Sequence, residues 1–229
     1  MNANSPCTGS DPAGPAASAV AARKILDEFG FQRTEIHLNE WHYLNVGWNE
    51  LRPTTREGFR VLRAKFQGTY GAEAAAFAMA VLIQLQDTPL DVANYFCAGA
   101  DTLHWSMFDE YGMPSPTYYA FRAFNELTKT PMRVPVTIPA SIHACAGLSE
   151  DKQRAGLLLA NFKNPQTRWD LSVQKLPLSG TVRLQKYLVD GRNNLLFTSR
   201  PGALHTENAS NDADEDLRDL RPGPVVHPA

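Results

Sequence analysis

One segment constrains the fold more than any other: residues 71–87, GAEAAAFAMAVLIQLQD, are apolar on nearly every side of a helix. Such a helix must be buried, so we expect other elements to pack around it. Helical patterns at 17–29 and 116–127 alternate with strand-like runs at 34–41 and 90–98. The order helix, strand, helix, strand, helix predicts an α/β arrangement with a parallel sheet.

After residue 130 the pattern changes to short runs of strand length separated by turn signals. These runs are VPVTIP, AGLLLANF, RWDLSVQKL, GTVRLQKYLVD and NLLFTS, which is typical of an antiparallel β-sandwich. The predicted fold class is therefore α/β followed by all-β. The expected divisions are a disordered or loop segment at 1–16, an α/β domain at 17–130, a β-sandwich at 131–200, and an acidic, Pro-rich tail at 201–229, partly disordered.

Charge and cysteine content exclude several kinds of partner and site. The 229 residues carry a net charge of −2, which gives no electrostatic basis for binding nucleic acid or an anionic membrane. No apolar run reaches the roughly 18 residues of a spanning helix. The beginning of the chain lacks the pattern of a signal peptide, so the compartment is unknown and cytoplasmic by default. Cys7, Cys97 and Cys145 are too few and too widely spaced for a disulfide framework or a zinc site.

The sequence contains no glycine-rich phosphate loop, no Gly-x-Ser-x-Gly elbow and no HExxH. We therefore expect no cofactor and no metal. His37 and His42 are the nearest approach to a metal pair, but five residues apart across a strand end they face differently. Polar packing is the favoured interpretation of both.

The segment RTEIHLNEWHY (33–43) has the pattern of a buried strand that ends in Glu40 and Trp41. Side chains alternate along a strand, so Ile36, Leu38 and Glu40 share one face. If the first two point into a barrel, Glu40 points inward as well, at the carboxyl end where barrel enzymes carry catalytic groups. A carboxylate there serves as nucleophile or acid/base, and Trp41 offers a flat face to a sugar ring. The alternative is a glutamate that caps a strand at the surface.

Four segments in the right order resemble glycoside hydrolase family 39, the β-xylosidase and α-L-iduronidase family. TEIHLNEWHY is similar to its seventh-strand nucleophile motif, and ARKILDEFGF to the preceding helix. WSMFDEYGMPSPTYYAFRAFNEL resembles its strand-eight loop and last helix. AGLLLANF and VRLQKYLVDGRNNLLF resemble the β-sandwich that follows the barrel. The resemblance covers about residues 20–200 and implies the carboxyl-terminal part of a (β/α)8 TIM barrel followed by a β-sandwich.

The resemblance implies a retaining mechanism. Glu40 would attack the anomeric carbon, and a second carboxylic acid roughly 5 Å away would protonate the leaving oxygen and later activate water. Asn39 would bond the sugar 2-hydroxyl if the strand end is bulged. The sugar platform would be Trp105 or Tyr95. The other predicted substrate contacts, for which packing or a solvated loop charge is the alternative, are Trp41, His42, Asp109 and Glu110.

The residue that would act as acid/base is missing from this pattern. In the family it ends strand four and usually follows an Asn. A complete barrel takes roughly 250 residues, but only about 130 precede the sandwich here, and they supply two strand-like runs. Glu50 and Glu57 lie in a loop, as do Asp109 and Glu110, and none has an Asn-Glu strand-end context. We therefore expect a glycosidase part that carries the nucleophile, with exposed sheet edges and a tendency to aggregate.

The predicted substrate is a xyloside- or uronide-containing glycan. Two alternatives remain open. One is a non-catalytic carbohydrate-binding or interaction module built on the sandwich. The other is a subunit completed by another chain that carries the remaining strands, or by a homo-oligomer. A second carboxylate within glycosidase distance of Glu40 would discriminate between the glycosidase and the non-catalytic module.

Overall fold

The computed structural model describes residues 8–99, 106–109, 111–140, 142–165, 171–174, 177, 183–191 and 206–208. The helices are α1 (Gly14–Glu28), α2 (Arg56–Tyr70), α3 (Ala72–Leu85) and α4 (Pro116–Leu127), with a short 3₁₀ turn at Trp48–Leu51. The strands are β1 (Thr8–Gly9), β2 (His37–Tyr43), β3 (Val92–Tyr95), β4 (Met132–Val134), β5 (His143–Leu148), β6 (Ala155–Ala160), β7 (Gln185–Tyr187) and β8 (Thr206–Asn208). Helices are thus combined with small sheets.

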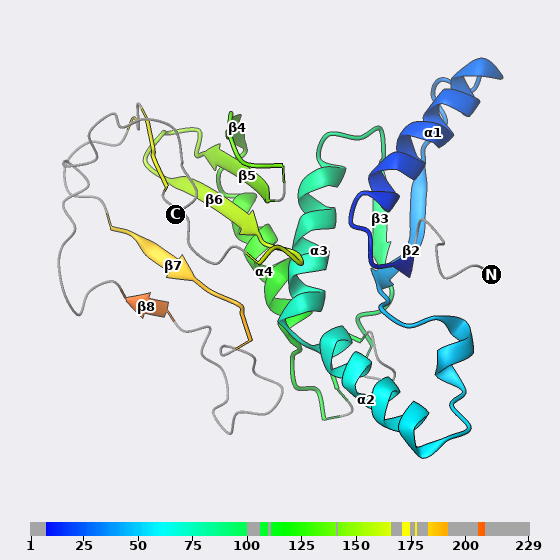
Figure 1. Cartoon of the computed structure of the whole chain (residues 1–229). Coiled ribbons are helices and arrows are strands. Elements are labelled where there is room, and N and C mark those ends of the chain that lie inside the picture. Colours follow the sequence, from blue (N-terminus) through cyan, green and yellow to red (C-terminus); the bar gives the residue numbers. More distant parts are fainter. Residues whose placement is uncertain are drawn as a thin grey trace.

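Helix α3 is apolar all round because its two sides belong to different cores. Phe77 and Val81 pack in one cluster with Trp41 of β2. Met79 and Ile83 pack in a second cluster with residues of α4, β5 and β6. Figure 1 shows α3 between the β1–β2–β3 sheet and the β4–β5–β6 sheet. The expectation that other elements surround this helix is confirmed.

The first sheet is parallel, with the strand order β1-β2-β3. The two strand-like runs predicted from the sequence form β2 and β3. The third strand, β1, is only two residues long and pairs beside the end of β2, where Thr8 is the partner of His42. The Leu44 amide then donates to the Gly9 carbonyl at 3.0 Å. Because β1 lies within the stretch expected to be a loop, that expectation is wrong for Thr8 and Gly9.

The second sheet is antiparallel, with the order β4-β5-β6. Gly147 of β5 and Gly156 of β6 are register partners. A Cβ atom at Gly147 would overlap the carbonyl oxygen of Thr130, and one at Gly156 would lie 2.9 Å from the Thr130 hydroxyl. The paired glycines therefore allow the chain just beyond α4 to lie directly on the sheet.

The predicted sandwich strands are reproduced only in part. AGLLLANF contains β6, and GTVRLQKYLVD contains β7. The structure assigns no strand to residues 135–139 or 171–174, which belong to two other predicted runs, and 194–199 lie outside the described residues. Strand β8 falls in the predicted tail, and β5 was not predicted. The described residues show small sheets, and a sandwich of two facing sheets is not confirmed.

Helix α1 begins at Gly14, three residues before its predicted start, because Pro15 suits the first turn of a helix. The Arg23 guanidinium donates to the Asp27 carboxylate at 2.9 Å and to the Thr34 carbonyl at 2.7 Å. Arg23 therefore fixes the loop between α1 and β2. Large apolar side chains remain exposed on α1 and in this loop: Val20, Ile25, Phe29 and Phe31.

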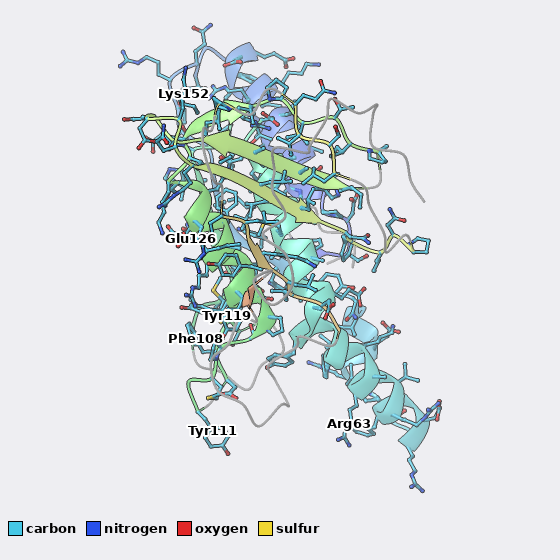
Figure 2. The ribbon with its side chains drawn as sticks, turned by 90° about the vertical axis from the view of Figure 1, so that its left-hand side faces the viewer. Arg63, Phe108, Tyr111, Tyr119, Glu126 and Lys152 are labelled. Carbon is cyan, nitrogen blue, oxygen red and sulfur yellow. The ribbon has the colours of Figure 1, made fainter. Side chains whose placement is uncertain are left out.

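Helix α2 extends away from the body of the molecule, with Arg63 near its outer part (Figure 2). The Thr55 hydroxyl caps it by accepting a hydrogen bond from the Gly58 amide at 3.1 Å. Phe59 and Val61 are exposed. Among the described helices, no single one is long and apolar enough to cross a membrane, while α2 and α3, bent by 49° between them, pass that test as a pair by length and composition.

Candidate functional site

The strand that carries Glu40 is bulged at that residue. Leu38 pairs with Ala93 of β3, and the next partners are Trp41 and Tyr95. Three steps along β2 therefore match two along β3, so β2 contains one extra residue. The bulge that would make Asn39 a credible sugar contact is present.

The bulge changes which side chains share a face. Leu38 and Trp41 are both buried toward α3, although strict alternation would place them on opposite sides. Asn39 and Glu40 are both exposed. The prediction that Leu38 and Glu40 share a face is therefore wrong, because the extra residue shifts the alternation. Glu40 lies away from the α3 layer.

Glu40 is a carboxylate without a protein partner in the described part of the chain, where no hydrogen bond or ion pair involves its side chain. Asn39 is likewise exposed and unengaged by any described residue. Strand β2 continues past Glu40 to Tyr43, so the prediction that the strand ends at Glu40 and Trp41 is wrong. The carboxylate of Glu40 is exposed and unpaired in the middle of the strand and is available to a ligand. A glutamate that merely caps the strand at the surface would be equally exposed. Exposure therefore does not distinguish a catalytic Glu40 from a surface one, and a test of its reactivity is needed.

Trp41 does not offer a face to solvent, because its side chain is completely buried. Tyr95 meets it edge-on, with ring centroids 5.1 Å apart, and Phe121 of α4 stacks on it at 5.8 Å. Among the described residues its indole N–H has no hydrogen-bond partner. The expectation of a sugar platform or substrate contact at Trp41 conflicts with this burial. Its packing alternative fits.

Tyr95 belongs to the same core. Burial raises the pKa of its phenol, and a hydrogen bond with Thr117 opposes that rise. The ring contacts both Trp41 and Phe121. Tyr95 therefore lies on the helix side of the sheet, on the opposite side from Glu40, and this position does not fit a platform for a sugar held at Glu40.

His42 is buried as well, at 7% exposure. Burial lowers its pKa from 6.5 to about 4, so the imidazole is neutral at physiological pH. Its ring lies 6.0 Å from that of Phe96. His37 is instead exposed and lies 2.9 Å from the Glu35 carboxylate. The two histidines thus occupy different environments, and His42 is not placed as a surface contact for a sugar.

Asp109 holds its own loop together. Its Oδ1 accepts hydrogen bonds from the amides of Tyr111 at 2.9 Å and Met113 at 2.8 Å. Tyr111, 82% exposed, lies at the tip of this loop (Figure 2). The carboxylate therefore has a structural role in the turn. The two other predicted contacts in this region, Trp105 and Glu110, lie outside the described residues.

Two carboxylates considered as replacements for the acid/base are held ionised. A hydrogen bond from Lys65, with a second from the Gly47 amide, lowers the pKa of Glu50. A hydrogen bond from Arg60 lowers the pKa of Glu57. A general acid needs a raised pKa to carry its proton at neutral pH. Neither residue has the electrostatic environment of an acid/base.

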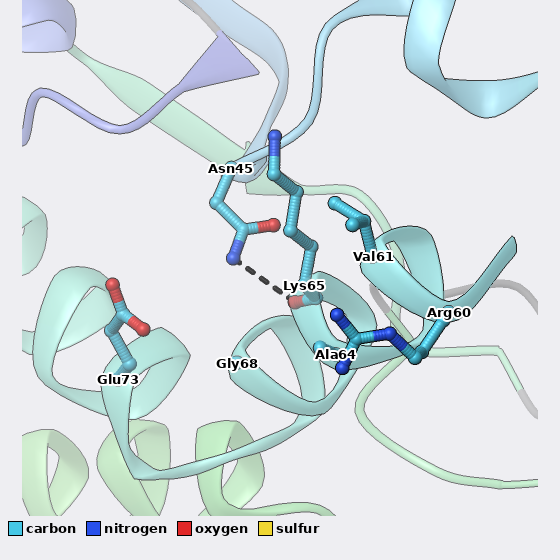
Figure 3. A pocket seen from close by; sticks show the side chains of 7 residues that line it. All are labelled: Asn45, Arg60, Val61, Ala64, Lys65, Gly68 and Glu73. Carbon is cyan, nitrogen blue, oxygen red and sulfur yellow. Dashed lines mark hydrogen bonds between the residues drawn. The ribbon is translucent and has the colours of Figure 1, made fainter. Parts of the chain in front are cut away.

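A shallow pocket of about 390 Å³ lies between α2 and the segment after β2 (Figure 3). The Asn45 amide donates to the Lys65 carbonyl at 3.0 Å within it. Glu73, on its far side, accepts a hydrogen bond from Tyr43 and pairs with Lys163 at 3.4 Å. Glu40 does not line this pocket, whose lining is Asn45, Arg60, Val61, Ala64, Lys65, Gly68 and Glu73.

Sequence reasoning did not single out Asn94. It is exposed on β3, between Ala93 and Tyr95, and so lies across from the two bulge residues. The run VANYF would have indicated it, because a polar residue between two half-buried ones points to the open face of the sheet. The bulge that makes this position matter has no signal in the sequence.

No protein-family model matches this chain, and a search of curated proteins finds no match. Among solved structures, the chain is similar to a crystal structure of a glucosidase from Croceicoccus marinus, with a TM-score of 0.53 and 25% sequence identity. The match covers 69% of this chain and 32% of the glucosidase chain. The chain therefore spans about a third of the length of that glucosidase. The likeness supports a relationship to glycosidases in general and not to family 39 in particular.

Proposed function

We propose that this chain carries the nucleophile part of a retaining glycoside hydrolase, with Glu40 as the nucleophile. The observation that carries the proposal is the position of Glu40: exposed and unpaired within the described residues, at a bulge in the middle of a parallel strand. The likeness to a glucosidase supports the reaction class. In finer terms, we propose a family 39-like arrangement: the last strands of a (β/α)8 barrel followed by a β-sandwich.

The chemistry assigned to Glu40 is nucleophilic displacement. A carboxylate oxygen forms a bond to the anomeric carbon as the bond from that carbon to the leaving oxygen breaks, and an acid gives the leaving oxygen a proton. Water then attacks the glycosyl-enzyme, loses a proton to the same acid/base, and releases the sugar and free Glu40. We propose that the acid/base lies outside the described residues, on this chain or on a complementing one.

A labelling experiment tests the nucleophile without requiring the acid. The probes are 2,4-dinitrophenyl 2-deoxy-2-fluoro-β-D-glucoside and the matching xyloside, whose leaving group departs without protonation. We expect intact-mass analysis to show one added sugar and peptide mapping to place it on Glu40. The Glu40→Gln variant, matched in size, should remain unlabelled. Labelling at another residue, or none on folded protein with either probe, would contradict the assignment.

A non-catalytic sugar-binding role is the second candidate. The observation that favours it is the ion pairing of Glu50 and Glu57, which leaves neither suited to act as the acid. Binding of methyl β-D-glucoside or methyl β-D-xyloside, measured by NMR, without any labelling of Glu40 would support this role over catalysis.

We also propose that a complementing polypeptide with further parallel strands and helices covers the exposed apolar side chains of α1 and its following loop. Val20, Ile25, Phe29 and Phe31 are each more than half exposed, and apolar groups gathered in this way mark interaction sites. Light scattering on the chain alone, and on Val20→Lys and Phe31→Lys variants, measures self-association. Association that both variants abolish would assign the surface to a second copy of this chain instead.

A further inference from the structure

The residue across from the bulge is Asn94. Leu38 pairs with Ala93 and Trp41 with Tyr95, so Asn94 alone stands opposite Asn39 and Glu40. Neighbouring strands lie about 4.8 Å apart in the hydrogen-bonding direction. Asn94 is therefore a close cross-strand neighbour of the proposed nucleophile.

Asn94 also points to the same side of the sheet. Ala93 and Tyr95 pack against the core beneath α3, and side chains alternate along β3, so Asn94 points away from that core. It is exposed, as are Asn39 and Glu40. None of the three side chains is engaged by another residue within the described chain. Two amides and one carboxylate thus stand together, all available to a ligand.

We infer that Asn94 is a sugar-contacting residue, which hydrogen-bonds hydroxyls of the glycone that Glu40 attacks, including those that a 2-deoxy-2-fluoro sugar retains; this inference rests on the proposed function. An amide carries both a donor and an acceptor group, so it can bond two neighbouring hydroxyls at once. Asn94 orients the sugar from β3 while Glu40 attacks from β2.

The first test compares the rate of covalent labelling, divided by the probe concentration, for three proteins. These are the wild type, Asn94→Ala and a matched control. The control is Asn125→Ala, an exposed asparagine on α4. Loss of a substrate hydrogen bond to a neutral group lowers binding by about 10-fold, and up to 100-fold when the partner is left unpaired. We expect a loss in that range for Asn94→Ala and none for Asn125→Ala. Wild-type rates in Asn94→Ala would overturn the inference.

The second test uses charge. Asn94→Asp places a carboxylate beside Glu40, and like charges close together make both harder to ionise. The acid limb of the labelling rate against pH should therefore move upward by roughly half a pH unit at low salt. A shift of this limb would show that position 94 lies beside Glu40, and an unmoved limb would contradict the placement of Asn94.

The inference and the proposed function fail in different ways. If Glu40→Gln abolishes labelling and Asn94→Ala does not change it, the function stands and the role of Asn94 falls. If the wild type is not labelled at all, binding of methyl β-D-glucoside and methyl β-D-xyloside by NMR decides. If Asn94→Ala weakens this binding, Asn94 is a sugar contact in a non-catalytic site. If Asn94→Ala leaves the binding unchanged, the role of Asn94 as a sugar contact is rejected.

Discussion

The rings of Trp41 and Tyr95 meet edge to face across β2 and β3, with centroids 5.1 Å apart and planes at 88°. The two residues are also backbone register partners, directly after the bulge. An edge-to-face pair of this kind contributes about 0.5–1.5 kcal/mol beyond the area that it buries. The pair therefore helps to set the register that brings Glu40 and Asn94 to the same level of the sheet.

Truncation of Trp41 should remove much of the stability of the chain. The side chain is fully buried, so Trp41→Ala should lower the free energy of unfolding by about 3–5 kcal/mol. Trp41→Phe should cost less, because it keeps an aromatic ring and removes an indole N–H that has no partner among the described residues. Urea unfolding measures both. Phe29→Ala, at a residue 74% exposed, is the control and should change little.

His42 should make stability depend on pH between about 4 and 6.5. Burial lowers its pKa from 6.5 to about 4 in the folded chain. As the pH falls through this window the unfolded chain takes up the proton first, so the free energy of unfolding falls. The loss reaches about 3 kcal/mol near pH 4, at roughly 1.4 kcal/mol for each pKa unit. Urea unfolding between pH 4 and 7 measures this slope.

Other groups contribute to acid sensitivity in the same direction, since Glu50 and Asp151 also have lowered pKa values. The informative quantity is therefore the difference in slope between wild type and His42→Gln. His37→Gln removes an exposed imidazole and serves as the control. A slope that His42→Gln does not flatten would show that His42 is not buried in its neutral form.

Asp87 and Arg133 should couple only weakly. Their side chains form a two-fold hydrogen-bonded pair at 2.7 and 2.8 Å between the end of α3 and β4. Both are partly exposed, at 67% and 45%, so water and salt weaken the attraction. A double-mutant cycle with Asp87→Asn and Arg133→Gln should give about 0.2–1 kcal/mol at low salt and less in 0.5 M salt. A larger, salt-independent coupling would mean that the pair is shielded from solvent.

Gly147→Ala should disturb the second sheet. An added methyl group would overlap the Thr130 carbonyl oxygen, which is backbone and cannot rotate away. Overpacking of this kind costs about 1–3 kcal/mol. Gly191→Ala is the control, because no residue in the described part of the chain lies within 4 Å of a Cβ atom there. Equal unfolding midpoints for the two variants would show that the chain after α4 does not rest on β5.

The elements that sequence reasoning found are those whose pattern is local. The apolar run of α3 and the Pro116 start of α4 are complete signals in themselves. Strand β5 was missed because its small residues, HACAGL, have little preference for a strand. It forms through pairing with β6 and because Gly147 admits Thr130, a contact that no window of sequence contains.

The sequence singled out Glu40, whose role stays a prediction, and did not indicate the environment that the fold builds around it. Glu40 was singled out because a carboxylate that follows an apolar, strand-like run is unusual, although β2 continues past it to Tyr43. The burial of Trp41 depends on Tyr95 and Phe121, which are distant in sequence. One extra residue in β2 decides which side chains face the ligand side, and an insertion of this kind depends on the register with β3. The pairing of β2 with β3 therefore breaks the regular alternation of side chains from which Leu38 and Glu40 were predicted to share a face.

The two-sided burial of α3 limits how a chain like this can be rebuilt. A helix that completes two cores cannot be assigned to either sheet as an exchangeable module. A recombination event that replaced β4–β6 would leave Met79 and Ile83 against a surface that does not pack with them. Successful exchange would have to carry α3 and α4 with the new sheet, or repack one side of α3 residue by residue. The smallest segment that could be exchanged without loss of packing is therefore larger than either sheet alone.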